Sequence, residues 1–129
     1  MLDNYPRVTV MDAGDDTGLH LAVAANPWRR IKGLLGQRLV PEDSGLLITP
    51  CSSIHCIGMS VTIDVVYVSR RNPDGFRRVL AIETVSPGRI GHSPRHANSV
   101  LELSEGAAER HGIRVGDQLA LVRVGGGCR

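Results

Sequence analysis

The chain has 129 residues, of which 42% are hydrophobic and 22% are charged, and its formal net charge is +2. This length and composition predict one small globular domain and exclude an intrinsically disordered chain. The arginines are scattered and form no basic stripe, so we expect no nucleic-acid partner. The N-terminus lacks a signal-peptide pattern and no apolar run approaches the roughly 18 residues of a membrane span, which favours a cytoplasmic protein.

The N-terminal part of the chain predicts a β-hairpin. Two short alternating runs, Arg7–Val10 and His20–Val23, flank the segment 12–18, which is rich in Asp and Gly. Alternating runs separated by turn-forming residues are typical of paired antiparallel strands. We therefore expect a strand at each run and a loop over 12–18.

One amphipathic helix is predicted over Pro27–Gly36. Asn26 fits its N-cap, proline suits the first helical position, and Gly36 fits its C-terminal end. Large apolar side chains recur along one face, namely Trp28, Ile31, Leu34 and Leu35. The charged side chains, including that of Arg30, then lie on the opposite, solvated face.

The rest of the chain is strand-like. Its β-prone runs are 46–48, 54–59, 61–68, 76–85, 100–103 and 118–124. The segment 72–75 reads as a hairpin turn, and 105–112 can form one short helix. Short strands without regular alternation with helices predict an antiparallel β-barrel or sandwich with two short helices. We expect one β-rich domain over 1–124 and a flexible glycine-rich tail over 125–129.

Three potential metal ligands cluster in the sequence at Cys51, His55 and Cys56. On a strand, His55 and Cys56 point to opposite faces, and Cys51 lies about 13 Å from His55 at about 3.3 Å per residue. Because a tetrahedral ion needs its ligands close together, we expect a buried thiol and a hydrogen-bonded histidine here, and no cofactor. A metal site remains the alternative interpretation.

Asp64 interrupts the apolar run 61–68. Alternation places Ile63, Val65 and Tyr67 on one face of a strand and Asp64 on the other, beside Val66 and Val68. An acid among such neighbours must accept hydrogen bonds or pair with a cation, because an unpaired buried carboxylate is costly. Arg30, Arg38 and the backbone of 55–60 are candidate partners. The residue is interpreted either as a structural tie or as a ligand-facing carboxylate.

Several segments together carry a family resemblance. They are Arg30–Leu35, then Ser53–Met59 running into Ile63–Tyr67, then Val100–Gly106 running into Gly112–Asp117. Over approximately residues 24–122 their order and spacing resemble the bacterial and archaeal family known as domain of unknown function 192. The resemblance implies a compact β-rich fold with two small helices, no assigned reaction and no established cofactor. Some members of this subtype are encoded beside pilus-assembly and secretion proteins, which implies an association with them.

These observations favour a non-catalytic binding or accessory module for an unknown protein or small ligand. The candidate contact residues are Arg30, His55, Met59 and Asp64. One alternative is a metal-binding or hydrolytic enzyme that uses the Cys51, His55 and Asp64 region. The other is an accessory protein of a pilus or secretion assembly.

Overall fold

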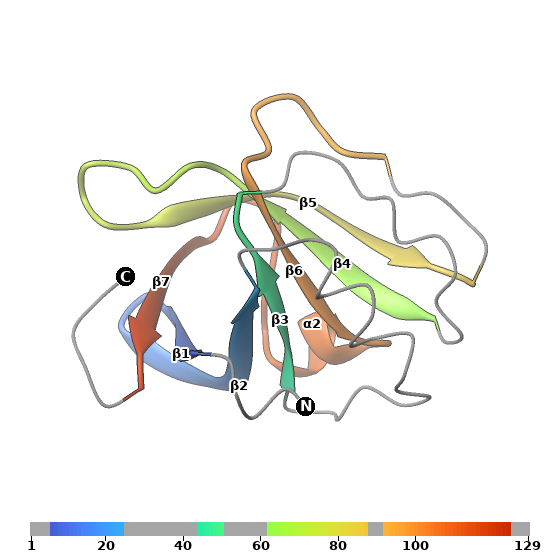
Figure 1. The fold of residues 1–129 in the computed structure, drawn as a ribbon, viewed down its shortest axis with the longest axis horizontal. Coiled ribbons are helices and arrows are strands. Elements are labelled where there is room, and N and C mark those ends of the chain that lie inside the picture. The colour runs from blue at the N-terminus through green and yellow to red at the C-terminus, as the bar shows by residue number, and fades with distance from the viewer. Residues whose placement is uncertain (1–5, 25–43, 51–61, 88–91, 125–129) are drawn as a thin grey trace.

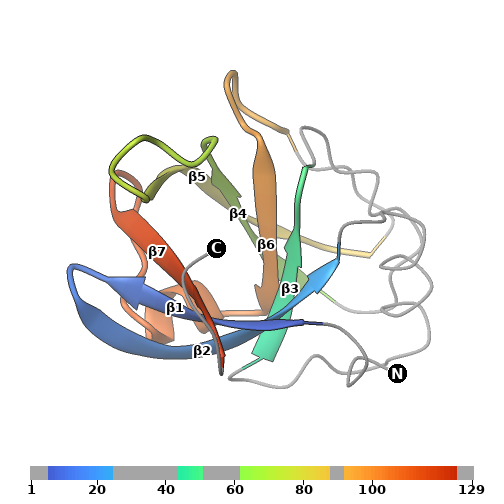
Figure 2. The ribbon, with the colours of Figure 1, turned by 60° about the vertical axis from the view of Figure 1, so that its left-hand side comes forward.

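The fold is a β-barrel. The computed structural model describes residues 6–24, 44–50, 62–87 and 92–124. The strands are β1 (Arg7–Asp12), β2 (Asp15–Ala24), β3 (Ser44–Ile48), β4 (Ile63–Val68), β5 (Arg77–Val85), β6 (Ser99–Ser104) and β7 (Gln118–Arg123). They close in the order β1-β2-β3-β6-β4-β5-β7, and Figures 1 and 2 show them curving around a common interior. The prediction of a mainly β barrel or sandwich is confirmed as a barrel.

The predicted N-terminal hairpin is confirmed, but its strands are longer than expected. β1 continues to Asp12 and β2 already begins at Asp15, so much of the predicted loop over 12–18 is strand. The turn is reduced to Ala13 and Gly14, whose φ angles are +53° and +85°. Positive φ at both central residues is what a tight two-residue hairpin turn requires, because its twist then matches that of the strands.

One pair of strands departs from the antiparallel prediction. β2 and β3 are parallel, with His20 opposite Ser44 and Ala24 opposite Ile48. The other neighbouring strands are antiparallel. A parallel pair needs a crossover of a dozen or more residues, and the sequence between Ala24 and Ser44 is long enough for one.

Both faces of the barrel wall are buried around β4. The interior cluster draws side chains from all seven strands, among them Val8, Leu21, Leu47, Val66, Val79, Leu101 and Leu119. A second cluster lies on the outer face and includes Leu46, Ile48, Ile63, Val65, Tyr67 and Val100. The predicted alternation along β4 is therefore confirmed, with Asp64 on the interior side beside Val66 and Val68.

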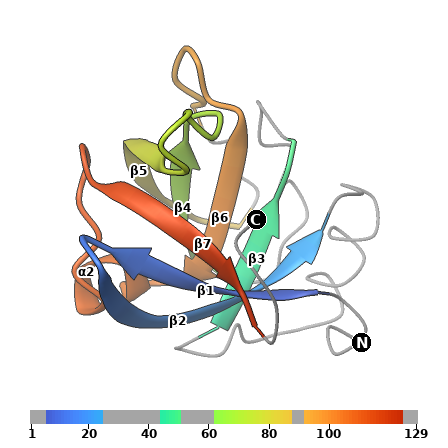
Figure 3. The ribbon, with the colours of Figure 1, turned by 90° about the vertical axis from the view of Figure 1, so that its left-hand side faces the viewer.

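The predicted C-terminal helix is present but shorter than 105–112. It is α2 (Ala107–Arg110), the one helix in the part of the chain that the structure describes. Its first two residues are buried in the interior cluster, and Figure 3 shows it at the end of the barrel near the β1–β2 turn. No helix among the described residues is long and apolar enough to cross a membrane. The helix predicted over 27–36 and the tail 125–129 lie outside the described residues.

Candidate functional site

Asp64 is a buried carboxylate that joins three elements. Its side chain is 4% exposed. The Thr84 hydroxyl on β5 donates to Oδ1 at 3.0 Å, and the Ala108 N–H of α2 donates to Oδ2 at 3.2 Å. α2 starts after Gly106 and receives no cap from a side chain at that position. Asp64 therefore supplies, from a distant strand, an acceptor for one of the N–H groups that a helix start leaves unsatisfied.

These partners of Asp64 differ from those that the sequence suggested. Arg30, Arg38 and the backbone of 55–60 lie outside the described residues, so those pairings stay predictions. Thr84 lies directly opposite Asp64 in the β4–β5 pairing, but a register shift between Tyr67 and Val68 means that counting outward from the 72–75 turn would have placed Glu83 there. No sequence signal pointed to Ala108.

A pocket of about 410 Å³ opens beside Asp64. Its lining includes Asp64, Ile82, Thr84, Glu109, Ile113 and Arg114. We call it the seam pocket, because it lies where the barrel wall between β5 and β7 opens. A concave site with apolar walls and a few convergent polar groups at a barrel opening is the usual form of a binding site.

The seam pocket exists because β5 extends beyond the residues that pair with β7. Only Arg77 and Arg78 of β5 lie in register with β7. Val79 then exchanges two backbone hydrogen bonds with the segment that precedes β7, at 2.8 Å to Asp117 O and 2.9 Å from Gly116 N. Beyond this point β5 continues to Val85 with β4 as its one described neighbour, while the chain on the other side turns toward α2.

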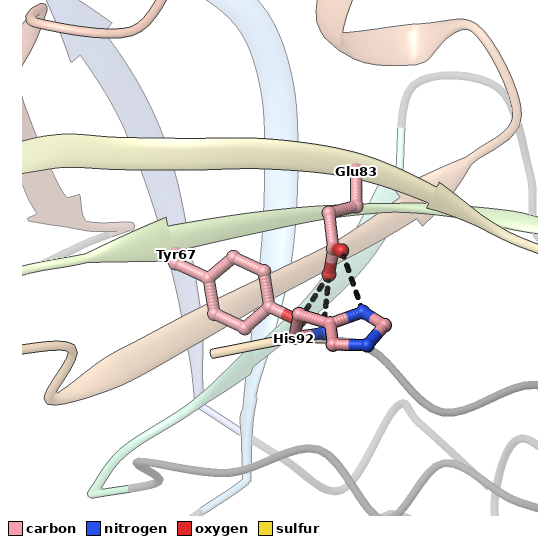
Figure 4. A network of polar contacts seen from close by, with 3 residues as sticks. All are labelled: Tyr67, Glu83 and His92. Atoms are coloured by element: carbon pink, nitrogen blue, oxygen red, sulfur yellow. Dashed lines mark hydrogen bonds and ion pairs between the residues drawn. The ribbon is translucent and has the colours of Figure 1, made fainter. Parts of the chain in front are cut away.

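A second polar group lies on the outer face of the barrel. The hydroxyl of Tyr67, which is fully buried, donates to Glu83 Oε2 at 2.6 Å. The backbone N–H of His92 donates to the same oxygen at 2.8 Å, and its ring Nδ1 lies 3.5 Å from Oε1, as Figure 4 shows. The His92 side chain is 91% exposed and that of Glu83 is 27% exposed. This network fixes the segment before β6 to the barrel and leaves one carboxylate partly accessible.

Another buried acid shares this outer face. Glu102 on β6 is 1% exposed, and Val65 of β4 lies directly between it and Glu83 in the strand registers. Both acids were missed as candidate site residues. Glu102 lies within the apolar run Val100–Leu103, so the signal that identified Asp64, an acid inside a β-prone run, was present there as well.

A group of aspartates surrounds a hollow of about 530 Å³ beside the β1–β2 turn. Partial burial, a hydrogen bond with Asp117 and the negative charges of Asp117 and Asp15 raise the pKa of Asp12 from 3.8 to about 6. Within the described residues, no group of three or more His, Cys, Asp or Glu side chains has the arrangement of a metal site. The ionised form of Asp12 is disfavoured by burial and by the neighbouring aspartates, and protonation relieves this cost.

Most of the residues predicted for a site have no described position. Arg30, Cys51, His55, Cys56 and Met59 lie outside the described residues. Their grouping with Asp64, as a contact surface or as a metal site, stays a prediction. Asp64 is the candidate whose position is described, and it lines the seam pocket.

Two solved structures share this fold. A crystal structure from Sinorhizobium meliloti 1021, whose description reads "putative transcription regulator", superposes with a TM-score of 0.68. Its sequence is 25% identical, and the match covers 89% of this chain and 93% of that chain. A protein of unknown function from Novosphingobium aromaticivorans is 20% identical, with a TM-score of 0.66 and coverage of 88% of this chain and 82% of that one. The second likeness concerns the fold alone.

The sequence identifies a family more directly than these structures do. None of the curated proteins matches it at a significant level. Residues 8–121 match the family model DUF192, described as "Uncharacterized ACR". The match spans most of the chain, including every described strand except the ends of β1 and β7. The chain belongs to the DUF192 family.

Proposed function

We propose that this protein is a non-catalytic binding module that holds its ligand in the seam pocket. The observation that carries the proposal is the buried carboxylate of Asp64 at this pocket. Both of its oxygens already accept a hydrogen bond, from Thr84 and from Ala108, so its position and direction are fixed before a ligand arrives. A carboxylate has about four acceptor sites, which leaves capacity for a donor on a ligand.

The lining chemistry supports binding over catalysis. Thr84 carries the one hydroxyl among the described lining residues, and it donates to a carboxylate. Among the described residues, the lining contains neither a cysteine nor a histidine that could serve as nucleophile and base in the usual arrangement. A metal-binding or hydrolytic enzyme that uses Cys51, His55 and Asp64 is the runner-up, and its residues lie outside the described ones except for Asp64.

Native mass spectrometry of protein purified from its own host tests the proposal. We expect a species of fixed mass to travel with the wild type and to be lost from Glu109→Trp, because the indole would fill the pocket from its exposed rim. Val115→Trp is the matched control, since Val115 is 61% exposed and lies outside the pocket lining. A bound mass that Glu109→Trp retains would contradict the proposal, and so would a wild type that carries no bound species.

A second candidate function comes from the Sinorhizobium protein, whose description names transcription regulation. DNA readers commonly place a helix in the major groove. In the described part of this chain the one helix, α2, has four residues and its first two are buried. We therefore place DNA binding second. A mobility-shift assay with mixed-sequence duplex DNA at rising salt would bring it forward if it showed tight, salt-dependent binding.

An accessory role in a pilus or secretion assembly is compatible with the same module, because such a role also needs a bound partner. Under that alternative the bound species would be a protein from the assembly. Co-purification under mild conditions, followed by the Glu109→Trp and Val115→Trp comparison, separates a partner in the seam pocket from one bound elsewhere.

A further inference from the structure

Within the part of the chain that the structure describes, the strand β5 has a free edge at the seam pocket, and the backbone pattern shows which residues form it. The carbonyl of Val68 at the end of β4 accepts the Asn98 N–H, at 2.9 Å, from the side of β6. Backbone groups point alternately to the two neighbours of a strand. Val66 and Asp64 therefore also direct their N–H and C=O groups toward β6, and Tyr67, Val65 and Ile63 direct theirs toward β5.

The same alternation fixes the direction of the groups on β5. The β5 partners of Tyr67, Val65 and Ile63 direct their backbone groups toward β4. These partners are Ala81, Glu83 and Val85. Ile82 and Thr84 consequently direct theirs away from β4, toward the open seam. Among the described residues, no backbone group pairs with either of them on that side.

This free edge coincides with the seam pocket. Ile82 and Thr84 both line it, Thr84 is exposed and Ile82 is half-buried. An unpaired strand edge is a template for another extended chain, since its N–H and C=O groups can continue the sheet. When an extended peptide adds to such an edge, main-chain hydrogen bonds supply affinity and a neighbouring pocket supplies side-chain specificity.

The charges of the pocket select the side chain that would enter it. Of the lining residues that the structure describes, Asp64 and Glu109 contribute two carboxylates, against the one guanidinium of Arg114. Asp64 is buried, so its negative charge is weakly screened by solvent. A cationic side chain on the incoming strand complements this balance.

We propose that the seam pocket takes an extended peptide segment of a partner protein, which adds as a strand to the edge at Ile82 and Thr84 and points a lysine or arginine side chain at Asp64. This inference rests on the proposed binding function and names its partner class. It requires that the ligand uses the Ile82 and Thr84 backbone, which a small molecule in the same pocket need not do.

Two substitutions of Thr84 isolate the backbone contribution. Thr84→Pro removes the outward N–H, and proline is tolerated on a strand edge whose N–H faces away from the sheet. It also removes the hydroxyl that donates to Asp64. Thr84→Val is the matched control, because it removes the same hydroxyl and keeps the N–H. The difference between the two variants therefore reports on the backbone hydrogen bond.

The experiment selects short randomised peptides by phage display against the full wild-type chain. We expect the enriched peptides to contain a Lys or Arg, and their binding to slow hydrogen exchange at the Ile82 and Thr84 amides. Affinity should be about three- to tenfold lower for Thr84→Pro than for Thr84→Val, as for the loss of one hydrogen bond. Norleucine in place of the peptide's basic residue should weaken binding to the wild type more than to Asp64→Asn. Glu109→Gln, at an exposed position, provides the same comparison if Asp64→Asn is poorly folded.

Each other outcome counts against the inference. Equal affinity for Thr84→Pro and Thr84→Val, or protection at other amides, would overturn it. So would protection of Ile82 and Thr84 that rises with protein concentration without peptide, since a second copy would then be the occupant. A small molecule of fixed mass, displaced by Glu109→Trp without amide protection, would overturn strand addition and leave the proposed function standing. If no peptide is enriched and no bound mass is found, both the strand addition and the proposed function are contradicted.

Discussion

The two faces of β4 hold acids in contrasting ways. On the interior face, Asp64 is enclosed and receives a hydroxyl from β5 and an N–H from α2. On the outer face, Glu83 receives the Tyr67 hydroxyl and the His92 N–H while 27% of its side chain stays exposed. The comparison teaches that enclosure, more than the number of hydrogen bonds, distinguishes a carboxylate that supports the fold from one that water also stabilises.

The largest expected effect is that of Asp64→Asn. The amide keeps the shape but turns one acceptor into a donor, which can face the Thr84 hydroxyl, itself able to accept, but cannot face the Ala108 N–H. We expect a loss of about 1 to 3 kcal/mol in the free energy of unfolding, because two charge-assisted hydrogen bonds to the buried carboxylate are replaced by weaker neutral ones. Urea denaturation at neutral pH measures it. An unchanged or higher stability would show that the bonds from Thr84 and Ala108 do not make Asp64 a support of the fold.

The matching change on the outer face should cost less. In Glu83→Gln the partly exposed side chain exchanges part of its hydrogen bonding with water, and in Tyr67→Phe the carboxylate keeps the His92 N–H. We expect each to lower the free energy of unfolding by about 0.5 to 1.5 kcal/mol. The same urea denaturation applies. If either cost as much as Asp64→Asn, enclosure would not explain the contrast between the two faces.

The aspartate hollow adds a third environment, in which an acid is repelled by its neighbours. Because its pKa is raised, Asp12 holds its proton more tightly in the folded state than in the unfolded state. The stability that this proton binding contributes is greatest below pH 3.8 and is lost as the pH rises to about 6. Asp12→Asn removes the repulsion. We expect it to raise stability at pH 7 by about 0.2 to 1 kcal/mol, with solvent screening limiting the effect.

Thermal unfolding of Asp12→Asn and wild type at several pH values checks this expectation. The gain should shrink as the pH falls through the interval from about 6 to 3.8. A gain that is equally large at low pH would show that the substitution acts through packing or turn geometry and not through charge.

The smallest expected effect concerns metal. If Cys51, His55 and Cys56 have structural roles, elemental analysis of the purified protein should show no stoichiometric zinc, and chelator should leave the melting temperature unchanged. One equivalent of zinc that is lost in His55→Ala would favour the metal-dependent alternative. It would also indicate that the region around Asp64 serves a metal site and not a peptide ligand.

Local patterns in the sequence predicted much of the barrel wall around β4. The alternation along 61–68 placed Asp64 on one face and Tyr67 on the other, and the turn at 72–75 is confirmed by the bond from Gly75 N to Asn72 O at 2.9 Å. Such features depend on side-chain period and on turn chemistry within a few residues. The sequence also required that Asp64 have partners, because the cost of an unpaired buried charge does not depend on the fold.

The identity of those partners depended on tertiary structure. Ala108 reaches Asp64 across 44 positions of sequence, and the parallel pairing of β2 with β3 follows from a long crossover. The free edge at Ile82 and Thr84 arises because β7 leaves β5 after two paired residues. Periodicity specifies which way a side chain points but not which strand lies beside it. Only the closure of the barrel decided that a carboxylate, a helix start and an unpaired strand edge meet at one pocket.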